Sequence, residues 1–390
     1  MYSGSIHDRR LRIATVTSHV DISGITTVLL NVLPRLDPQR FENLIICLKK
    51  RGKRANDFER RGIDVHTTRV HGRGLNPISV IRLMLLLQRL RPHVVHAHGT
   101  VPAIYATTAA RLARVPVIIA HHHGTDSIQR PGQARHERRQ SSFHDATVHV
   151  SHAVHRYYLD RVQPHIDSGR VIYNGIDADR ATQPIGHERR QDLEQALGIT
   201  QRHPRVLCPA RLQPDKGQDE ILNAFEILRT NHPNAVLLLT GTGDLFEPLA
   251  KRIRAHGLSD TVKLLGNRND MDSLYQIADF GVLYSIREGF SLVVLEAMAY
   301  GLPMVLTDVG GNREAIGDSG AAIIIPAGDH SALRSAMSQL MSDRAAVSKM
   351  SQVARQRVRN FPLDAQVQAF ADLYQELALA KGLAVPELAH

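Results

Sequence analysis

The chain has 390 residues, more than one ordinary domain holds, so two domains are expected. Hydrophobic residues make up 43% of it and charged residues 22%, a balance that excludes a disordered chain. Only 5% of the residues are aromatic and Trp is absent, which argues against a stacking groove for single-stranded nucleic acid.

The net charge of +10 is unevenly distributed. Residues 1–200 hold 29 Lys and Arg against 17 Asp and Glu, whereas residues 201–390 hold 19 against 21. No acidic residue lies between Asp64 and Asp126. The excess favours an anionic partner for the first half, although a generally Arg-rich composition explains it equally well.

The cysteines, the N-terminal residues and the length of the apolar runs indicate the cellular compartment. Cys47 and Cys208 each lie in an apolar run, so we expect buried thiols in a reducing environment and no thiolate metal cage. No apolar stretch approaches the roughly 18 residues of a membrane span, and residues 1–12 lack a secretory core. A cytoplasmic location is expected, with peripheral contact at the inner membrane face as a further expectation.

Short apolar runs alternate with helical patterns along the chain, which predicts parallel sheets covered by helices. In the first half, strands are expected over 12–17, 44–48, 63–66, 94–97, 117–120 and 147–150. A helix is expected over 78–90, and Ser151 is expected to cap another that runs towards Val162. After Tyr173 a polar segment extends to about residue 202 and is the candidate linker.

The alternation then restarts. Strands are expected over 206–208, 236–239, 262–265, 280–283, 304–306 and 322–325, with helices over 218–229 and 249–255 and a helical tail over 363–383. The predicted fold class is α/β, with two Rossmann-like doubly wound domains over 1–184 and 185–362 facing a central cleft. Ligands of such sheets bind at the carboxyl ends of the strands.

The segment from Ser285 to Gly311 carries most of the predicted chemistry. Glu288 and Glu296 lie eight positions apart, and Gly289, Phe290 and Ser291 open the helix between them. The backbone N–H groups of Ser291, Leu292 and Val293 would form an anion site at the helix N-terminus. The two carboxylates would accept hydrogen bonds from hydroxyls, as in a nucleotide-sugar pocket. On spacing alone, a first-turn charge and a solvated helix face remain an alternative.

Two loops that follow strands add to this segment. Arg211 and Lys216, five positions apart, can place two positively charged side chains beside one anion, so that Mg²⁺ is not needed to neutralise it. Gly241 and Gly243 allow the backbone to approach a ligand closely. Taken singly, either loop is equally consistent with an ordinary surface turn.

Together these motifs resemble the retaining glycosyltransferases of family four, the glycosyl transferases group 1 with the GT-B fold. The resemblance rests on Glu288-Gly289-Phe290 through Glu296-Ala297-Met298-Ala299-Tyr300-Gly301, on Thr307–Gly311, on Arg211 with Lys216-Gly217, on Gly241-Thr242-Gly243 and on Asn174–Asp177. It covers nearly the whole chain and is strongest from 205 to 330.

The resemblance implies roles for single residues. Arg211 and Lys216 would bind the donor diphosphate, Glu296 the ribose and Glu288 the sugar hydroxyls, and the loop of Leu265, Asn267 and Arg268 would contact the base. Gly24 would allow backbone approach from the first domain, where Ser23 replaces the family's first Gly. The C-terminal helix, about 363–390, would pack back on the first domain.

The histidines are candidate metal ligands, since imidazoles suit Zn²⁺. Because consecutive strand residues alternate faces, His121, His122 and His123 cannot all converge, and no metal site is expected. By resemblance, His123 would contact the donor sugar as a catalytic residue, although which of the three histidines faces the donor stays open. His98, Arg130 and Arg135 are weaker candidates on the acceptor side.

The expected function is therefore metal-independent, retaining transfer of a sugar from a nucleoside-diphosphate sugar, without a cofactor. A UDP-sugar is favoured over GDP-mannose, and the acceptor is a saccharide, a glycolipid or a small molecule of polysaccharide or glycolipid biosynthesis. An anionic membrane surface is a further expected partner, and nucleic acid is not. The alternatives are a nucleotide-sugar epimerase or sugar phosphorylase on the same fold, or a non-catalytic binding partner.

Overall fold

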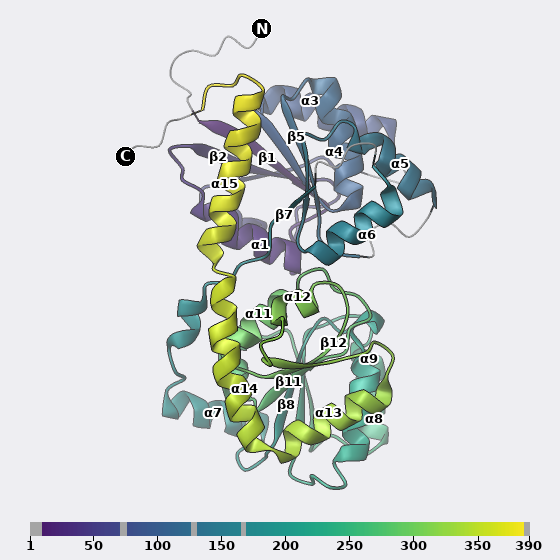
Figure 1. Cartoon of the computed structure of the whole chain (residues 1–390), viewed down its shortest axis with the longest axis vertical. Helices are drawn as coiled ribbons and strands as arrows, with labels where there is room; N and C mark the ends of the chain where they lie inside the picture. The colour runs from purple at the N-terminus through teal and green to yellow at the C-terminus, as the bar shows by residue number, and fades with distance from the viewer. Residues whose placement is uncertain (1–9, 71–75, 126–130, 165–168, 386–390) are drawn as a thin grey trace. The chain divides into compact units, whose positions relative to one another are not determined.

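The computed structural model describes residues 10–70, 76–125, 131–164 and 169–385 (Figure 1). The chain divides into two compact units, which are described separately here. Unit 1 comprises Met1–Asn174 and Leu363–His390, and unit 2 comprises Gly175–Pro362.

Unit 1 contains a parallel sheet of seven strands in the order β3-β2-β1-β4-β5-β6-β7. The strands are β1 (Leu11–Thr17), β2 (Phe41–Cys47), β3 (Asp64–Thr67), β4 (Val94–His98), β5 (Val117–His122), β6 (Ala146–His149) and β7 (Gly169–Val171). The helices are α1 (Gly24–Val32), η1 (Leu33–Arg35), α2 (Ala55–Glu59), α3 (Pro77–Leu90), α4 (Thr100–Ala113), α5 (Pro131–Ser141), α6 (His152–Val162) and α15 (Leu363–Ala380).

Helices cover both faces of this sheet. Val95, Ala97 and Ala120 face a core that α3 and α4 complete, whereas the alternate residues of the same strands face α15. Ser151 caps α6, as predicted, by accepting a hydrogen bond from Val154 N at 3.2 Å. Burial on both faces explains why the strands form continuous apolar runs in the sequence.

Unit 2 contains a parallel sheet of six strands in the order β10-β9-β8-β11-β12-β13. The strands are β8 (Arg205–Pro209), β9 (Val236–Thr240), β10 (Val262–Gly266), β11 (Phe280–Leu283), β12 (Met304–Thr307) and β13 (Ala322–Ile325). The helices are η2 (Ala178–Thr182), α7 (His187–Leu197), η3 (Pro214–Lys216), α8 (Gln218–Leu228), α9 (Phe246–Ala255), α10 (Met271–Ile277), α11 (Leu292–Ala299), α12 (Asn312–Ile316), α13 (His330–Ser342), α14 (Arg344–Arg357) and η4 (Val358–Asn360).

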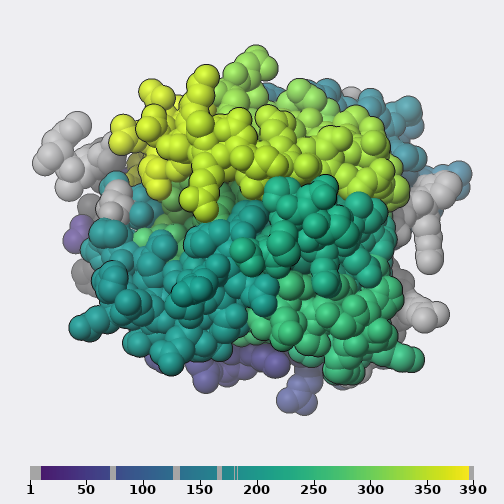
Figure 2. Space-filling view, turned by 90° about the horizontal axis from the view of Figure 1, so that it is seen from below, coloured from purple at the N-terminus to yellow at the C-terminus, as the bar shows by residue number. Residues whose placement is uncertain are grey.

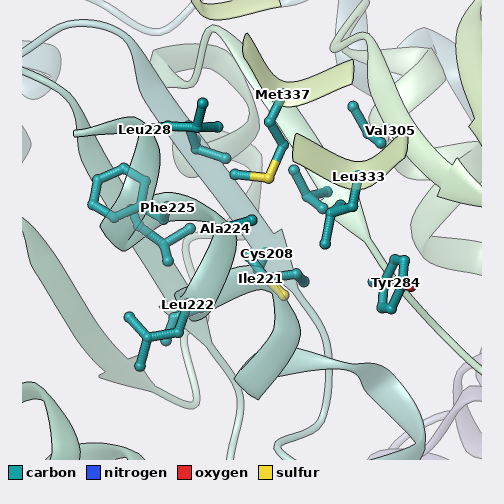
Figure 3. Close-up of a cluster of buried hydrophobic side chains, with 14 of the residues drawn as sticks. Cys208, Ile221, Leu222, Ala224, Phe225, Leu228, Tyr284, Val305, Leu333 and Met337 are labelled. Atoms are coloured by element: carbon teal, nitrogen blue, oxygen red, sulfur yellow. The ribbon is translucent and has the colours of Figure 1, made fainter. Parts of the chain in front are cut away.

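The core of unit 2 lies between this sheet and the helices α8 and α13. Figure 3 shows Phe225 and Leu228 of α8 near Met337 of α13, with Cys208 of β8 beneath them. Figure 2, which views the molecule from below relative to Figure 1, shows the yellow-green surface of the α13–α14 region next to the teal and green surface of earlier segments of unit 2. Cys47 and Cys208 are both buried free thiols, as predicted, and burial raises the pKa of each to about 12.

The candidate linker, the polar segment after Tyr173, begins where the two units divide. The units divide after Asn174, before the expected boundary at 184, and the segment forms η2 and α7 within unit 2. The earlier boundary reflects backbone pairing within unit 2, where Ile176 N donates to Phe361 O at 3.0 Å. Glu194 accepts a hydrogen bond at 2.7 Å from Arg205, whose side chain is 1% exposed, so a helix of polar composition is fixed to the sheet.

Each sheet has the 3-2-1-4-5-6 order of the Rossmann fold when its strands are numbered within the unit, with β7 added in unit 1. The predicted α/β class with two Rossmann-like units is therefore confirmed. Among the described residues, no helix is long and apolar enough to cross a bilayer.

Candidate active site

Four of the predicted site segments follow strands of unit 2, and each begins where its strand ends. The loop with Arg211 and Lys216 follows β8, the glycine loop follows β9, Asn267 follows β10, and Glu288 lies between β11 and α11. Because the strands are parallel, these loops share the carboxyl edge of one sheet.

Lys216 and Glu288 are brought together by this arrangement. Lys216 Nζ lies 2.7 Å from Glu288 Oε1, and their side chains are 14% and 11% exposed. Ser285 Oγ donates a second hydrogen bond to the same oxygen at 2.7 Å. Arg211 remains exposed, and its guanidinium pairs with no other residue in the described part of the chain.

Glycines make the close packing of these loops possible. Gly217 has φ of +68°, and an added Cβ would lie 2.3 Å from the carbonyl oxygen of Tyr284. Gly310 has φ of +54°, and its added Cβ would lie 1.9 Å from the carbonyl oxygen of Glu288. A side chain at either position would therefore displace the loop that carries Glu288.

Helix α11 begins after Ser291, whose backbone forms the N-cap. The first N–H groups of the helix, including those of Leu292 and Val293, have no partner within the helix and form the positive end of its dipole. Gly289 and Phe290 are buried just before it. Gly289 is fixed further by the hydrogen bond from Gly311 N to its carbonyl oxygen at 2.7 Å.

Glu296 lies one turn further along α11 and has a partner that the sequence did not indicate. Tyr275 of α10 donates its hydroxyl hydrogen to Glu296 Oε2 at 2.8 Å. Burial and the nearby Glu296 carboxylate raise the pKa of Tyr275 well above its ordinary value, so the phenol stays protonated. Tyr275 therefore orients the Glu296 carboxylate through one of its oxygens.

The loop expected to contact a base is also ordered by polar pairs. Arg268 donates two hydrogen bonds to Asp270, at 2.8 and 2.6 Å, and this pairing lowers the pKa of Asp270. Asn267 is exposed, and Leu265 is half-buried beside it. On the facing loop, Gly241 has φ of +96°, and its N–H donates to Gly266 O at 2.7 Å. An added Cβ at Gly243 would lie 2.2 Å from Leu212 O.

The other predicted site residues belong to unit 1. Gly24 is the first residue of α1, and Ser23 caps that helix by accepting a hydrogen bond from Thr26 N. His98 Nδ1 and His123 Nε2 lie 3.0 Å apart. The ring of His121 stacks on that of His123, whereas His122 faces the opposite side, beside Glu137. Arg135 is exposed on α5, and Arg130 lies outside the described residues.

Solved structures share the fold of this chain. The chain superposes on Anabaena HepE, solved in complex with UDP-glucose, with a TM-score of 0.82 at 20% identity, covering 94% of this chain and all of the other. The expected GT-B fold is therefore confirmed; at this level of identity the likeness shows the fold alone.

The family follows from two sequence models. The model of glycosyl transferases group 1 matches residues 189–357, and that of glycosyltransferase family 4 matches residues 22–180. The chain thus belongs to the group 1 glycosyltransferases of the family 4 type, as its motifs predicted, and it is a glycosyltransferase.

Two relatives illustrate the range of this family. The chain is 25% identical to the Escherichia coli UDP-Gal:alpha-D-GlcNAc-diphosphoundecaprenol alpha-1,3-galactosyltransferase, over 95% of this chain and 98% of that protein. It is 28% identical to glycogen synthase of Mycobacterium tuberculosis (strain ATCC 25618 / H37Rv), over 79% of this chain and 76% of that protein.

Proposed function

We propose that the protein transfers a sugar, with retention of configuration, from a nucleoside-diphosphate sugar held by unit 2. The observation that carries the proposal is the shared carboxyl edge of the second sheet, where Lys216, Glu288, Glu296 and the N-terminus of α11 gather. Cations and free N–H groups suit a diphosphate, and carboxylates suit sugar and ribose hydroxyls.

When the donor binds, the ion pair between Lys216 and Glu288 breaks, and each residue then contacts a different part of the donor. The diphosphate competes with Glu288 for Lys216 Nζ, and Arg211 adds a second, unpaired cation. Once released, the Glu288 carboxylate accepts hydrogen bonds from hydroxyls of the transferred sugar, and Ser285 keeps it oriented. Donor binding thus replaces one ion pair within the protein with two sets of contacts, one to the diphosphate and one to the sugar.

Retention is attributed to attack by the acceptor hydroxyl on the same face of the sugar that the diphosphate leaves. The departing phosphate oxygen takes the acceptor proton, and Arg211 and Lys216 stabilise the growing negative charge. Glu288 positions hydroxyls in this scheme and forms no covalent intermediate. Transfer proceeds without a metal ion because side chains supply the charge that Mg²⁺ would otherwise provide.

UDP-sugars are the favoured donors, with GDP-mannose second. The Escherichia coli relative bears the name of a UDP-galactose enzyme with a lipid-diphosphate acceptor, which supports a UDP-sugar and a glycolipid or saccharide acceptor. His123, His98 and Arg135 are assigned to the acceptor and sugar side in unit 1.

A lipid-linked acceptor would bring the protein to a membrane, and helix α3 offers a suitable surface. Ile78, Ile81 and Leu85 are 62%, 50% and 55% exposed, and they follow the i, i+3, i+7 spacing of one helix face. Arg82 and Arg89 are exposed on the same face. Apolar side chains flanked by arginines suit the interface of an anionic bilayer.

A transfer assay tests the proposed function. The chain is incubated in EDTA with UDP-glucose, UDP-N-acetylglucosamine, UDP-galactose or GDP-mannose, together with saccharide and lipid-diphosphate acceptors. We expect one donor to yield free nucleoside diphosphate and a product whose anomeric proton coupling matches that of the donor. Inverted product would refute retention. Isomerised donor without acceptor would indicate an epimerase, and binding without turnover would indicate a non-catalytic partner.

A further inference from the structure

Four histidines of unit 1 gather on the face of the sheet that α15 covers. His96 and His98 lie on β4, His121 lies on β5 in register with His98, and His123 follows two residues later. Their rings are in contact, with centroids 4.2 Å apart for His96 and His98 and 4.8 Å apart for His98 and His121. His96, His98 and His121 are 1%, 3% and 0% exposed.

Hydrogen bonds occupy one ring nitrogen of His96 and one of His98, but neither nitrogen of His121. His96 Nδ1 lies 2.7 Å from the hydroxyl oxygen of Tyr374 on α15, and His98 Nδ1 lies 3.0 Å from His123 Nε2. The remaining nitrogens, Nε2 of His96, Nε2 of His98 and both of His121, have no hydrogen-bond partner in the described part of the chain. The buried hydroxyl of Thr15, the register partner of His96 on β1, is also unpartnered there.

Unsatisfied buried polar atoms are rare in folded proteins, because each costs about 1–3 kcal/mol. A bound ion would remove this cost at three atoms at once. One ring nitrogen from each of His96, His98 and His121 lies within 4.8 Å of the others. A tetrahedral Zn²⁺ with bonds of about 2.0–2.1 Å needs ligand atoms about 3.4 Å apart, so modest side-chain rotations would close the set.

We propose that His96, His98 and His121 form a metal site for a divalent transition ion of the zinc class. Imidazole nitrogens are preferred by Zn²⁺, Ni²⁺ and Cu²⁺ over Mg²⁺ or Ca²⁺. Tyr374 and His123 serve as the outer partners: a ligating histidine donates its other N–H to such a group, which fixes the tautomer and the ring orientation.

Neutral rings are required for this role, and the surroundings supply them. Burial lowers the pKa of His96 to about 3 and that of His98 and His121 well below the ordinary value. Each ring therefore keeps a lone pair at neutral pH. The three ligands all belong to unit 1, and none of the proposed donor-binding side chains of unit 2 is among them, so the site is compatible with metal-independent transfer. Its connection to the reaction is structural, because His98 orients His123.

No metal site is expected from β5 alone, because adjacent residues of one strand alternate faces. That argument holds within β5, since His122 turns to the opposite face beside Glu137. The pairing of β4 with β5 brings His96 and His98 to the same face as His121. The H-x-H spacing of β4 provides two ligands on one face, and the register of β4 with β5 adds His121.

The test uses the full chain, purified without a histidine tag and stripped of metal. Zn²⁺ is added and excess removed, and bound zinc is measured by mass spectrometry. We expect one equivalent per chain for the wild type. His121→Phe should lower the affinity at least about 100-fold, since one of three ligands is lost. His149→Phe is the matched control, because His149 is equally buried but lies on the opposite face, beside His122.

Two further measurements test the zinc site if His121→Phe does not fold. X-ray absorption of the zinc-loaded wild type should show three imidazole ligands and no sulfur. Tyr374→Phe should keep the stoichiometry and weaken zinc about 10- to 100-fold, as expected for an outer partner. A wild type that retains no zinc, a spectrum without imidazoles, or equal loss in His121→Phe and His149→Phe would overturn the site and leave a cluster of neutral histidines.

Discussion

At the residue scale, Lys216 and Glu288 neutralise each other in the protein without its donor. Both side chains are mostly buried, so removal of one leaves an unpaired charge beside the site. Substitutions at the two positions should therefore act in opposite directions on a bound anion. This expectation arises from the structure, because the sequence places the two residues 72 positions apart.

The first prediction concerns this pair and the bare nucleoside diphosphate. Lys216→Ala should weaken its binding about 10- to 150-fold, because a charge-assisted hydrogen bond worth about 1.5–3 kcal/mol is lost. Glu288→Gln should leave diphosphate affinity unchanged or higher, since Lys216 is released, while transfer falls. Calorimetric titration measures both affinities, and an equal loss in the two variants would disprove the assigned roles.

The second prediction concerns Tyr275, which orients the Glu296 carboxylate. Glu296→Gln should weaken binding of the nucleoside diphosphate and of the sugar nucleotide alike. Tyr275→Phe should weaken both to a smaller degree, about 3- to 10-fold, because one hydrogen bond to a carboxylate is removed. Pyrophosphate, which lacks the ribose, is the control ligand. A parallel loss of pyrophosphate binding in Tyr275→Phe would indicate general damage to the site and contradict a role at the ribose.

At the scale of elements, the loops after β8, β11 and β12 pack so closely that glycine is required at their contacts. Hydrogen bonds support the packing: Ile286 N donates to Asp215 O at 2.9 Å, and Gly311 N donates to Gly289 O at 2.7 Å. The position of Glu288 is therefore set by its neighbouring loops as well as by its own.

The third prediction compares two glycines with similar backbone angles. Gly310→Ala and Gly257→Ala both place a side chain at positive φ, at +54° and +63°, but only the first meets another backbone atom within 3 Å. Gly310→Ala should destabilise the fold by about 1–3 kcal/mol more than Gly257→Ala and should also reduce transfer. Thermal melting of both variants gives the comparison. Equal melting temperatures would show that the loop contact is unimportant.

The fourth prediction concerns the exposed face of α3. Binding to anionic vesicles should fall when Ile81 and Leu85 are both changed to Gln, and each of Arg82→Gln and Arg89→Gln should reduce it about fivefold, at about 1 kcal/mol per charge. Ile227→Gln is the matched control, because Ile227 is 55% exposed on α8 in unit 2. Co-sedimentation at low and high salt measures the bound fraction. Equal, salt-insensitive binding to neutral and anionic vesicles would exclude the membrane surface.

At the scale of the whole molecule, the fold could be predicted because parallel strands buried on both faces are continuous apolar runs. Strand β7 was missed, since its three residues include Arg170 and form no such run. The unit boundary differs from the expected one because Ile176, whose N–H donates to Phe361 O at 3.0 Å, already belongs to unit 2.

The residues of the candidate site could be predicted where they belong to local sequence motifs. Glu288, Glu296, Arg211 and Lys216 belong to local motifs, and their loops do share one edge of the sheet. Ser285 and Tyr275 were missed because short polar side chains and helix tyrosines carry no pattern of their own, and their contacts depend on packing between elements. The histidine cluster required the order of β4 and β5, which no local spacing specifies.

Calorimetric titration of the full chain with UDP-sugars and GDP-mannose, in buffer containing EDTA, tests the central claim most directly. We expect one donor to bind at one molecule per chain without a divalent ion, and Lys216→Ala and Glu296→Gln each to weaken this binding. Binding that requires Mg²⁺ or Mn²⁺, or the absence of binding to every nucleotide sugar, would contradict it.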